Sequence, residues 1–126
     1  MSQKRILIID DEADIREVAK LSLILTKQWD VLTASSGEEG KKIALEFQPD
    51  AILLDLIMPN LGGLDTLKLF KESPKISDIP ILLLTATAKL AVKVEYVQWG
   101  AQGIIIKPFD PGTLGDQIEQ LLGWEK

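Results

Sequence analysis

The feature of this sequence that most constrains its fold is a set of short, uninterrupted apolar runs that each stop at a polar residue. There are four: Ile6–Ile9 before Asp10 and Asp11, Ala51–Leu54 before Asp55, Ile81–Leu84 before Thr85, and Ile104–Ile106 before Lys107. Runs of this length without polar alternation are typical of strands buried on both faces, as in a parallel sheet covered by helices. Ligands of such sheets bind outside the carboxyl ends of the strands. One edge of this sheet is therefore expected to collect three carboxylates, a hydroxyl and an ammonium group.

Helical patterns separate the apolar runs. In the first helix, which begins near Asp11 or Glu12, helical spacing relates Ile15, Val18, Ser22 and Leu25. We expect further helices over Gly37–Phe47, from Leu64 to before Pro74, over about Lys89–Trp99, and from an N-cap at Asp110 with Pro111 in the first turn. Asp30–Ala34 adds a short strand. Five repeats of strand then helix, joined by right-handed crossovers, predict a doubly wound α/β sandwich around a parallel sheet. With no linker or repeat, residues 1–126 are expected to form a single domain.

The composition excludes several kinds of site. The chain has no cysteine, which excludes disulfides, thiolate zinc sites and cysteine nucleophiles. It has no histidine, so it lacks the commonest general base and cannot itself carry a phosphohistidine. The net charge of -5 argues against direct binding to nucleic acid, whose phosphates require a basic face.

The sequence also bears on location. No apolar stretch reaches the ~18 residues that a membrane span needs, so we expect no membrane insertion. Met1–Arg5 leads directly into the first apolar run and leaves no room for a signal peptide. We therefore expect a cytoplasmic protein.

The acidic residues at the predicted sheet edge favour a metal site. At ~4 Å and an effective dielectric of about 20, each close pair of carboxylates costs on the order of 4 kcal/mol, so the cluster either protonates or recruits a cation. Oxygen ligands without histidine or cysteine favour Mg²⁺ or a similar hard ion, Mn²⁺ included. The alternative is that Asp10 and Asp11 cap the first helix and Asp55 caps a turn. Lys107 supplies a point charge for a phosphoryl oxygen or a carboxylate, and the Thr85 hydroxyl can donate to a second phosphoryl oxygen.

Other phosphate-binding motifs do not fit the sequence. Gly37–Lys42 has the wrong spacing for a P-loop and lacks its hydroxyl residue, and the chain has no G-x-G-x-x-G fingerprint. Hydrolases of the haloacid dehalogenase type carry D-x-D after the first strand, whereas here adjacent aspartates end that strand. Nucleotide-binding and hydrolase functions are therefore disfavoured.

Taken together, these motifs resemble the response-regulator receiver domain, the family of the bacterial chemotaxis response regulator. The likeness extends over essentially the whole chain and rests on Ile9–Glu12, Leu54–Pro59 with Gly62–Gly63, Thr85–Ala86, Gly100–Ala101 and Lys107–Phe109. It implies a flavodoxin-like strand order 2-1-3-4-5 and a phosphorylation-dependent switch in two-component signalling.

The resemblance also implies a role for individual residues. Asp55 would accept a phosphoryl group from a histidine kinase or a histidine phosphotransfer protein. Mg²⁺, or Mn²⁺, would be held by Asp10, Asp11, Asp55 and the backbone carbonyl of Ile57. Thr85 and Lys107 would bind the phosphoryl oxygens, and the peptide bond between Lys107 and Pro108 is expected to be cis. Such a domain is not an enzyme beyond its own phosphorylation and dephosphorylation.

Three features concern the switch and its output. Ile104 occupies a position that is aromatic in many members of the family, so it is either a switch residue or part of the core. Ile57 and Thr87 flank the expected approach of hydrolytic water and are candidates for tuning the phosphoryl lifetime. In the predicted fourth helix, an apolar stripe opposite the first is formed by Val92, Tyr96 and Trp99. This stripe is either a partner face or is covered by neighbouring residues.

We therefore expect a receiver domain that changes its partner-binding face, formed by the fourth helix, the fifth strand and the last helix. Its downstream partner is an unknown protein, and it is a monomer or a phosphorylation-dependent homodimer. One alternative is a receiver-like binding module that is never phosphorylated, and another is the receiver fragment of a larger regulator with an effector domain. A Mg²⁺-dependent phosphatase is a third, for which the short loops leave little room.

Overall fold

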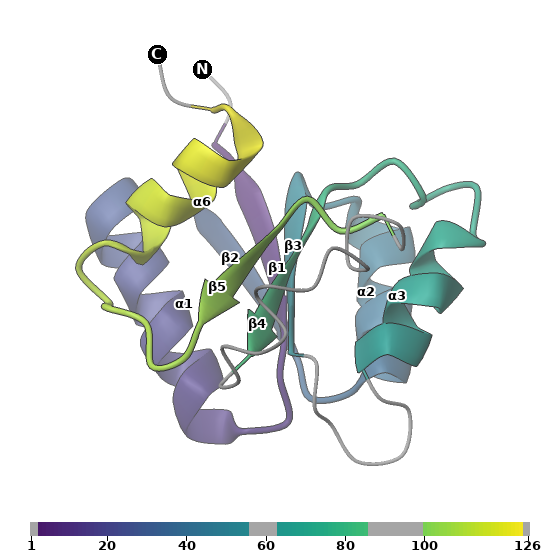
Figure 1. Ribbon diagram of the computed structural model, residues 1–126, viewed down its shortest axis with the longest axis horizontal. Coiled ribbons are helices and arrows are strands. Elements are labelled where there is room, and N and C mark those ends of the chain that lie inside the picture. Colours follow the sequence, from purple (N-terminus) through teal and green to yellow (C-terminus); the bar gives the residue numbers. More distant parts are fainter. Residues whose placement is uncertain (1–2, 56–62, 86–99, 125–126) are drawn as a thin grey trace.

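The computed structural model of the protein describes residues 3–55, 63–85 and 100–124. The strands are β1 (Arg5–Ile9), β2 (Asp30–Ala34), β3 (Ala51–Asp55), β4 (Ile81–Thr85) and β5 (Gly103–Ile106). The helices are α1 (Ala13–Lys27), α2 (Gly37–Phe47), α3 (Gly63–Lys71) and α6 (Leu114–Leu122). Neighbouring strands pair in parallel in the order β2-β1-β3-β4-β5 (Figure 1), which confirms the predicted doubly wound sheet. The helix predicted over Lys89–Trp99 lies outside the described residues.

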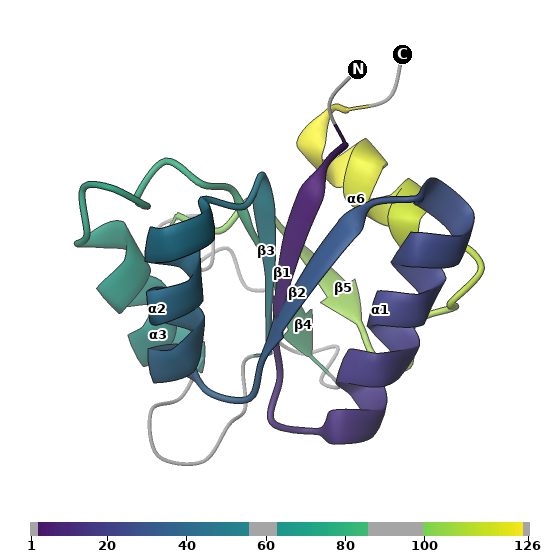
Figure 2. The same cartoon turned by 180° about the vertical axis from the view of Figure 1, so that it is seen from behind.

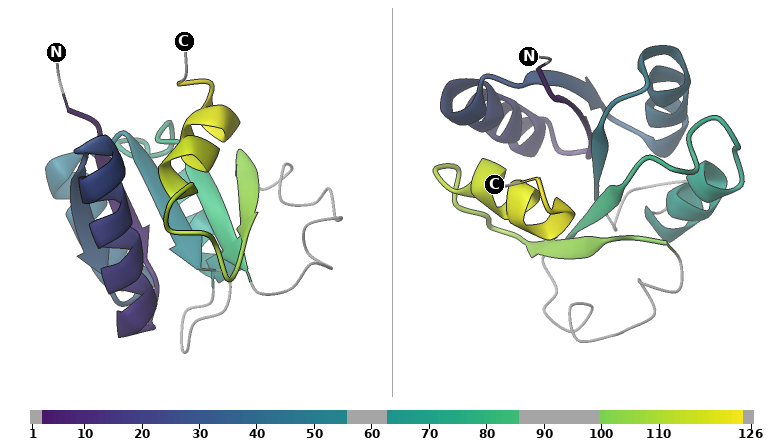
Figure 3. Two further views of the ribbon diagram at one scale, coloured as in Figure 1. Left: turned by 90° about the vertical axis from the view of Figure 1, so that its left-hand side faces the viewer. Right: turned by 90° about the horizontal axis from the view of Figure 1, so that it is seen from above.

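The sheet separates two helical layers. Helices α1 and α6 cover one face, and α2 and α3 cover the other (Figures 2 and 3). Successive strand residues point to opposite faces, so Ile6 and Ile8 join the core under α1 and α6, whereas Leu7 and Ile9 join the core under α2 and α3. All four of these side chains are fully buried. This burial on both faces explains why the strands are continuous apolar runs.

The start of α2 is set by short-range polar contacts. The Ser36 side chain accepts a hydrogen bond from the Glu39 N–H at 3.1 Å, and the Glu39 carboxylate accepts one from the Ser35 N–H at 2.7 Å. This arrangement is close to a capping box and satisfies N–H groups that the helix itself leaves unpaired. It places α2 over the range that the sequence predicts.

The last helix begins later than predicted. Asp110 is not its N-cap, because Oδ1 of Asp110 accepts the Gly112 N–H at 2.8 Å and its carbonyl accepts the Thr113 N–H at 3.0 Å. These bonds close a turn, and the helix starts at Leu114 with Thr113 as its N-cap. Gly112 favours this outcome, since glycine is costly inside a helix and common in turns.

The buried face of α1 is rotated from the one that the apolar spacing predicts, and the prediction was wrong for Val18 and Leu25. Ala19, Ser22 and Leu23 are buried, whereas Val18 is 43% exposed and Leu25 is 77% exposed. Ala19 and Leu23 join the core under α1 and α6 instead.

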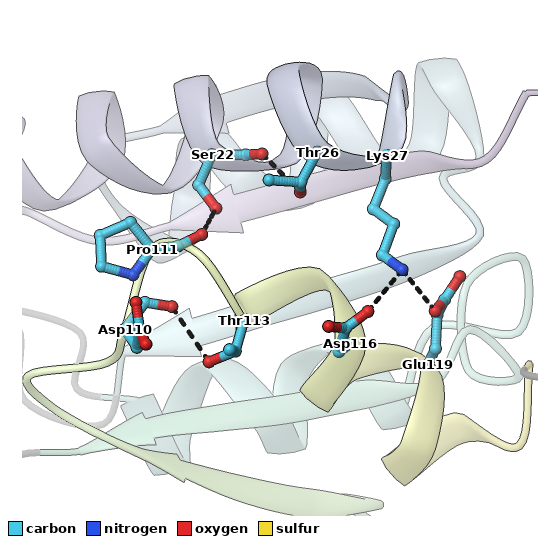
Figure 4. A network of polar contacts seen from close by, with 8 residues as sticks. All are labelled: Ser22, Thr26, Lys27, Asp110, Pro111, Thr113, Asp116 and Glu119. Carbon is cyan, nitrogen blue, oxygen red and sulfur yellow. Dashed lines mark hydrogen bonds and ion pairs between the residues drawn. The ribbon is translucent and has the colours of Figure 1, made fainter.

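Polar contacts join α1 to α6 and to the loop before it (Figure 4). The Lys27 ammonium lies 2.6 Å from an Asp116 oxygen and 2.7 Å from a Glu119 oxygen. The Ser22 hydroxyl donates to the carbonyl of Pro111. The loop between Lys107 and α6 is therefore attached to α1 directly through Pro111, and the helix that follows this loop is attached to α1 through Lys27.

The strands all point toward one end of the molecule, and the two chain ends leave from the opposite end (Figure 1). At that opposite end the rings of Trp29 and Trp124 meet edge to face with centroids 5.6 Å apart. The Lys4 ammonium lies 4.5 Å from the centroid of the Trp124 ring. Among the described residues, the helices are too short or too polar to cross a membrane.

Candidate functional site

The predicted polar residues lie together at the carboxyl ends of four neighbouring strands, β1, β3, β4 and β5. Ile9 of β1 is paired with Leu54 of β3, so Asp10 and Asp55 emerge side by side. Thr85 of β4 is paired with Ile106 of β5, and the Thr85 carbonyl accepts the Lys107 N–H at 2.7 Å. The strand register therefore aligns all four residues along one edge.

Three carboxylates form a tight cluster at this edge. One oxygen from each of Asp10, Asp11 and Asp55 lies within 4.8 Å of the other two. Asp10 and Asp55 are buried, whereas Asp11 is exposed. The cluster is thus open to solvent on the Asp11 side and enclosed on the other.

The backbone around Asp10 is held by hydrogen bonds. Its N–H donates to the Ala34 carbonyl at 3.1 Å, and its Oδ1 accepts the Glu12 N–H at 2.9 Å. The Arg16 guanidinium donates to its carbonyl at 2.7 Å. These contacts fix the direction of the Asp10 carboxylate before any ligand is bound.

Lys107 lies among the acidic residues. Its Nζ is 2.8 Å from Oδ2 of Asp10, 3.2 Å from Oε1 of Glu12 and 3.5 Å from Oδ1 of Asp55. Its side chain is only 10% exposed. Burial alone would lower the pKa of this lysine, but the contact with Asp10, the negative charge of Asp55 and the hydrogen bond to Glu12 together raise it. The ammonium form is therefore firmly maintained.

The cluster fits a hard divalent cation. All its donors are carboxylate oxygens, which suit Mg²⁺ or Mn²⁺. Oδ2 of Asp10 is buried and, apart from its ion pair with Lys107, has no hydrogen-bond partner among the described residues. The Lys107 ammonium offsets only part of the negative charge of Asp10, Asp11 and Asp55. A cation would supply both the missing charge and a partner for the buried oxygen.

The other predicted site residues fall into two groups. Thr85 is buried at the end of β4, and the peptide bond between Lys107 and Pro108 is cis, as the resemblance implies. Ile104 is partly buried on β5 and packs against the core under α2 and α3. Outside the described residues lie Ile57, Thr87, Val92, Tyr96 and Trp99. The roles suggested for these five stay predictions.

Sequence reasoning did not single out Glu12 and Arg16 as site residues. Glu12 could have been suspected because it extends Asp10 and Asp11 into an acidic triplet. Arg16 offered no local signal, since its contact with the Asp10 carbonyl depends on the direction in which α1 leaves the sheet.

Comparisons with known proteins agree with this geometry. Residues 6–119 match the family model of the response regulator receiver domain. The chain is 34% identical over 118 residues to the DNA-binding dual master transcriptional regulator RpaA of Synechocystis sp., covering 94% of this chain and 48% of that protein. It is 34% identical over 122 residues to the phosphate regulon transcriptional regulatory protein PhoB of Pseudomonas aeruginosa, covering 97% of this chain and 53% of that protein.

A solved structure shows the same fold. The chemotaxis response regulator CheY4 of Vibrio cholerae superposes with a TM-score of 0.86 at 29% identity, covering 95% of this chain and 99% of that one. The chain spans about half the length of the curated relatives it matches. From the matched family model, the strand order and the acidic cluster, the chain belongs to the response-regulator receiver domains of two-component systems.

Proposed function

We propose that this domain is a phosphorylation switch in which Asp55 accepts a phosphoryl group from a histidine kinase or a histidine phosphotransfer protein. The observation that carries the proposal is the position of the Asp55 carboxylate. It is buried at the end of β3, within 4.8 Å of carboxylate oxygens of Asp10 and Asp11, and 3.5 Å from the Lys107 ammonium. A nucleophile with a cationic group and a metal-binding cluster beside it is what phosphoryl transfer needs.

In the proposed reaction a carboxylate oxygen of Asp55 attacks the phosphorus atom of a phosphohistidine. The bond between phosphorus and the imidazole nitrogen breaks, its electron pair stays on that nitrogen of the departing histidine, and an acyl phosphate forms on Asp55. Lys107 and Thr85 would hold phosphoryl oxygens, since both lie at the same sheet edge. Such a transfer depends on positioning and charge more than on a general base, so the lack of histidine is no obstacle.

The proposed metal is Mg²⁺, with Mn²⁺ as a substitute. Asp10, Asp11 and Asp55 would hold it, and the Ile57 carbonyl is the further ligand that the family resemblance implies. When bound, the ion would offset the negative charge of the phosphoryl oxygens.

The proposed output is a change in the surface formed by β5, α6 and the helix predicted over 89–99. The domain would act in the cytoplasm and catalyse only its own phosphorylation and dephosphorylation. A second candidate is favoured by the relatives, which are about twice as long and are named transcriptional regulators. In that case this chain would be the receiver part of a regulator whose effector domain binds DNA. The acidic charge of -5 argues against DNA binding by the receiver itself.

The proposal is tested by phosphorylation of the wild-type chain and an Asp55→Asn variant with acetyl phosphate. We expect Mg²⁺-dependent labelling of the wild type and no labelling of Asp55→Asn. Asp78→Asn is a matched control, because Asp78 is an exposed aspartate before β4, away from the carboxyl edge. Labelling of Asp55→Asn at the wild-type rate would show that the acceptor is wrongly assigned. A wild type that neither takes label nor binds beryllofluoride with Mg²⁺ would favour the unphosphorylated binding module.

A further inference from the structure

The carboxylates that the Lys107 ammonium contacts in the described part of the chain differ in their exposure to solvent. The side chain of Asp10 is fully buried and that of Asp55 nearly so, whereas the side chain of Glu12 is 60% exposed. Glu12 therefore lies on the solvent side of the ammonium, and the two aspartates lie on its buried side. A phosphoryl donor reaches Lys107 from the solvent side.

The backbone of Glu12 is held by hydrogen bonds at the start of α1, and its side chain takes no part in them. Glu12 is the N-cap residue of α1, its N–H donates to Asp10 at 2.9 Å, and its carbonyl accepts the Arg16 N–H at 3.1 Å. Its side chain makes no capping hydrogen bond, although N-cap positions favour short side chains that do. The carboxylate instead accepts a hydrogen bond from Lys107 at 3.2 Å. It can leave Lys107 without disturbing α1.

Binding of a phosphoryl group changes the competition for this ammonium. A lysine ammonium has three N–H groups, and three carboxylates lie around the one on Lys107. The phosphoryl group carries roughly -1.5 to -2 charges, and Asp55 loses its own carboxylate charge when the acyl phosphate forms, so the site beside Glu12 becomes more negative by about one charge. The Glu12 carboxylate then both competes for the ammonium and repels the new charge.

We propose that Glu12 is a positioning residue that holds Lys107 in the unphosphorylated protein and thereby restrains binding of the phosphoryl group. The inference rests on the proposed function, since it assumes that Lys107 binds a phosphoryl oxygen. Phosphorylation is accompanied by release of the Glu12–Lys107 contact, and the strength of this contact sets part of the affinity of the site for phosphoryl groups.

Glu12→Gln removes the charge and keeps the size of the side chain. The probe is beryllofluoride, a mimic of the phosphoryl group, titrated by calorimetry at saturating Mg²⁺. We expect the affinity of Glu12→Gln for beryllofluoride to be about two- to fivefold higher than that of the wild type. This factor corresponds to the free energy of one exposed ion pair. The matched control is Asp14→Asn, since Asp14 is an exposed residue in the same turn and forms no ion pair with Lys107 in the part of the chain that the structure describes.

A double-mutant cycle shows whether Glu12 acts through Lys107. In a Lys107→Met background, Glu12→Gln should leave the affinity for beryllofluoride unchanged. An equal gain in both backgrounds, or an equal gain in Asp14→Asn, would mean that only the overall charge matters and would overturn the inference. A merely structural role would lower the melting temperature of Glu12→Gln without raising its affinity, which also contradicts the inference.

The outcome separates this inference from the proposed function. If the wild type binds beryllofluoride and Glu12→Gln binds it with the same affinity, the role of Glu12 is wrong and the phosphorylation switch stands. If the wild type does not bind beryllofluoride at all, both are wrong.

Discussion

At the scale of single residues, the carboxyl edge of the sheet holds more negative than positive charge. Asp10, Asp11 and Asp55 lie within 4.8 Å of one another, and Lys107 contacts two of them. Like charges at such distances repel, so the cluster lowers the stability of the fold when no cation is bound. Functional sites commonly carry such a cost.

Asp11→Asn is expected to change the free energy of unfolding in opposite directions, relative to the wild type, with and without Mg²⁺. Asp11 is the exposed member of the cluster, so its removal leaves packing intact. Without Mg²⁺, the loss of repulsion should raise the free energy of unfolding by about 1 kcal/mol. With Mg²⁺, the wild type should gain stability from binding the ion and the variant should gain much less. Urea unfolding in both conditions measures the difference, and an equal Mg²⁺ increment in the two proteins would contradict the assignment of Asp11 as a ligand.

Residues at the site differ in how far the sequence could predict them. Asp10, Asp55 and Lys107 were predictable because each ends a buried strand, and parallel strands end at the same edge. The contact of Glu12 with Lys107 was not, since it joins residues 95 positions apart through an exposed side chain. No local pattern determines the rotamer of such a side chain.

At the scale of elements, the helices act in pairs on the two faces of the sheet. Lys27 joins α1 to α6, and Ser22 joins α1 to the loop before α6 (Figure 4). On the other face, α2 approaches α3 where Gly37 meets Thr66. The bounds of α2 were predictable because Ser36 and Glu39 act locally. The start of α6 was not, because an aspartate that accepts a nearby N–H is found both at N-caps and in turns, and Asp110 forms the turn.

Gly37→Ala tests the packing of α2 on α3. A Cβ atom at Gly37 would lie 2.1 Å from Oγ1 and 3.0 Å from Cβ of Thr66, so rotation of the threonine side chain alone does not remove the close contact. We expect a loss of about 1–3 kcal/mol in the free energy of unfolding, although alanine is ordinarily the better helix former. The double variant with Thr66→Ala should recover most of the loss in urea unfolding. A stabilised Gly37→Ala would show that the helices lie further apart.

Lys27→Met tests the attachment of α1 to α6 through its pH dependence. Hydrogen bonds to Asp116 and then Glu119 raise the pKa of Lys27 above its ordinary value of 10.5. The stabilisation that Lys27 gains from these two carboxylates is therefore fully present below pH 10.5. It is lost as the pH rises through the raised pKa of Lys27 in the folded state. At neutral pH we expect Lys27→Met to unfold more easily by about 0.5–1 kcal/mol, because the pair is partly solvated.

The difference between Lys27→Met and wild type should shrink in strongly alkaline solution. Lys42→Met, at an exposed position on α2, is the control and should change stability little at any pH. A Lys27→Met deficit that is the same at neutral and alkaline pH would mean that the loss comes from packing against Gly115 and not from charge.

At the scale of the whole molecule, the site and the chain ends lie at opposite ends of the sheet (Figure 1). Trp29, Trp124 and Lys4 close the end at which the chain enters and leaves. A domain joined at either end would therefore begin on the side of the sheet opposite the carboxyl edge. This arrangement is compatible with relatives about twice as long, in which the receiver is one part of the protein.

Every role proposed for the carboxyl edge depends on Asp55 being the residue that carries the phosphoryl group. The most direct measurement is to phosphorylate the wild-type chain with acetyl phosphate and Mg²⁺ and to locate the group by fragment-ion mass spectrometry. We expect one phosphoryl group on Asp55, which hydroxylamine removes because it is an acyl phosphate. A group found instead on Asp10, Asp11 or Thr85, or one that resists hydroxylamine, would contradict it.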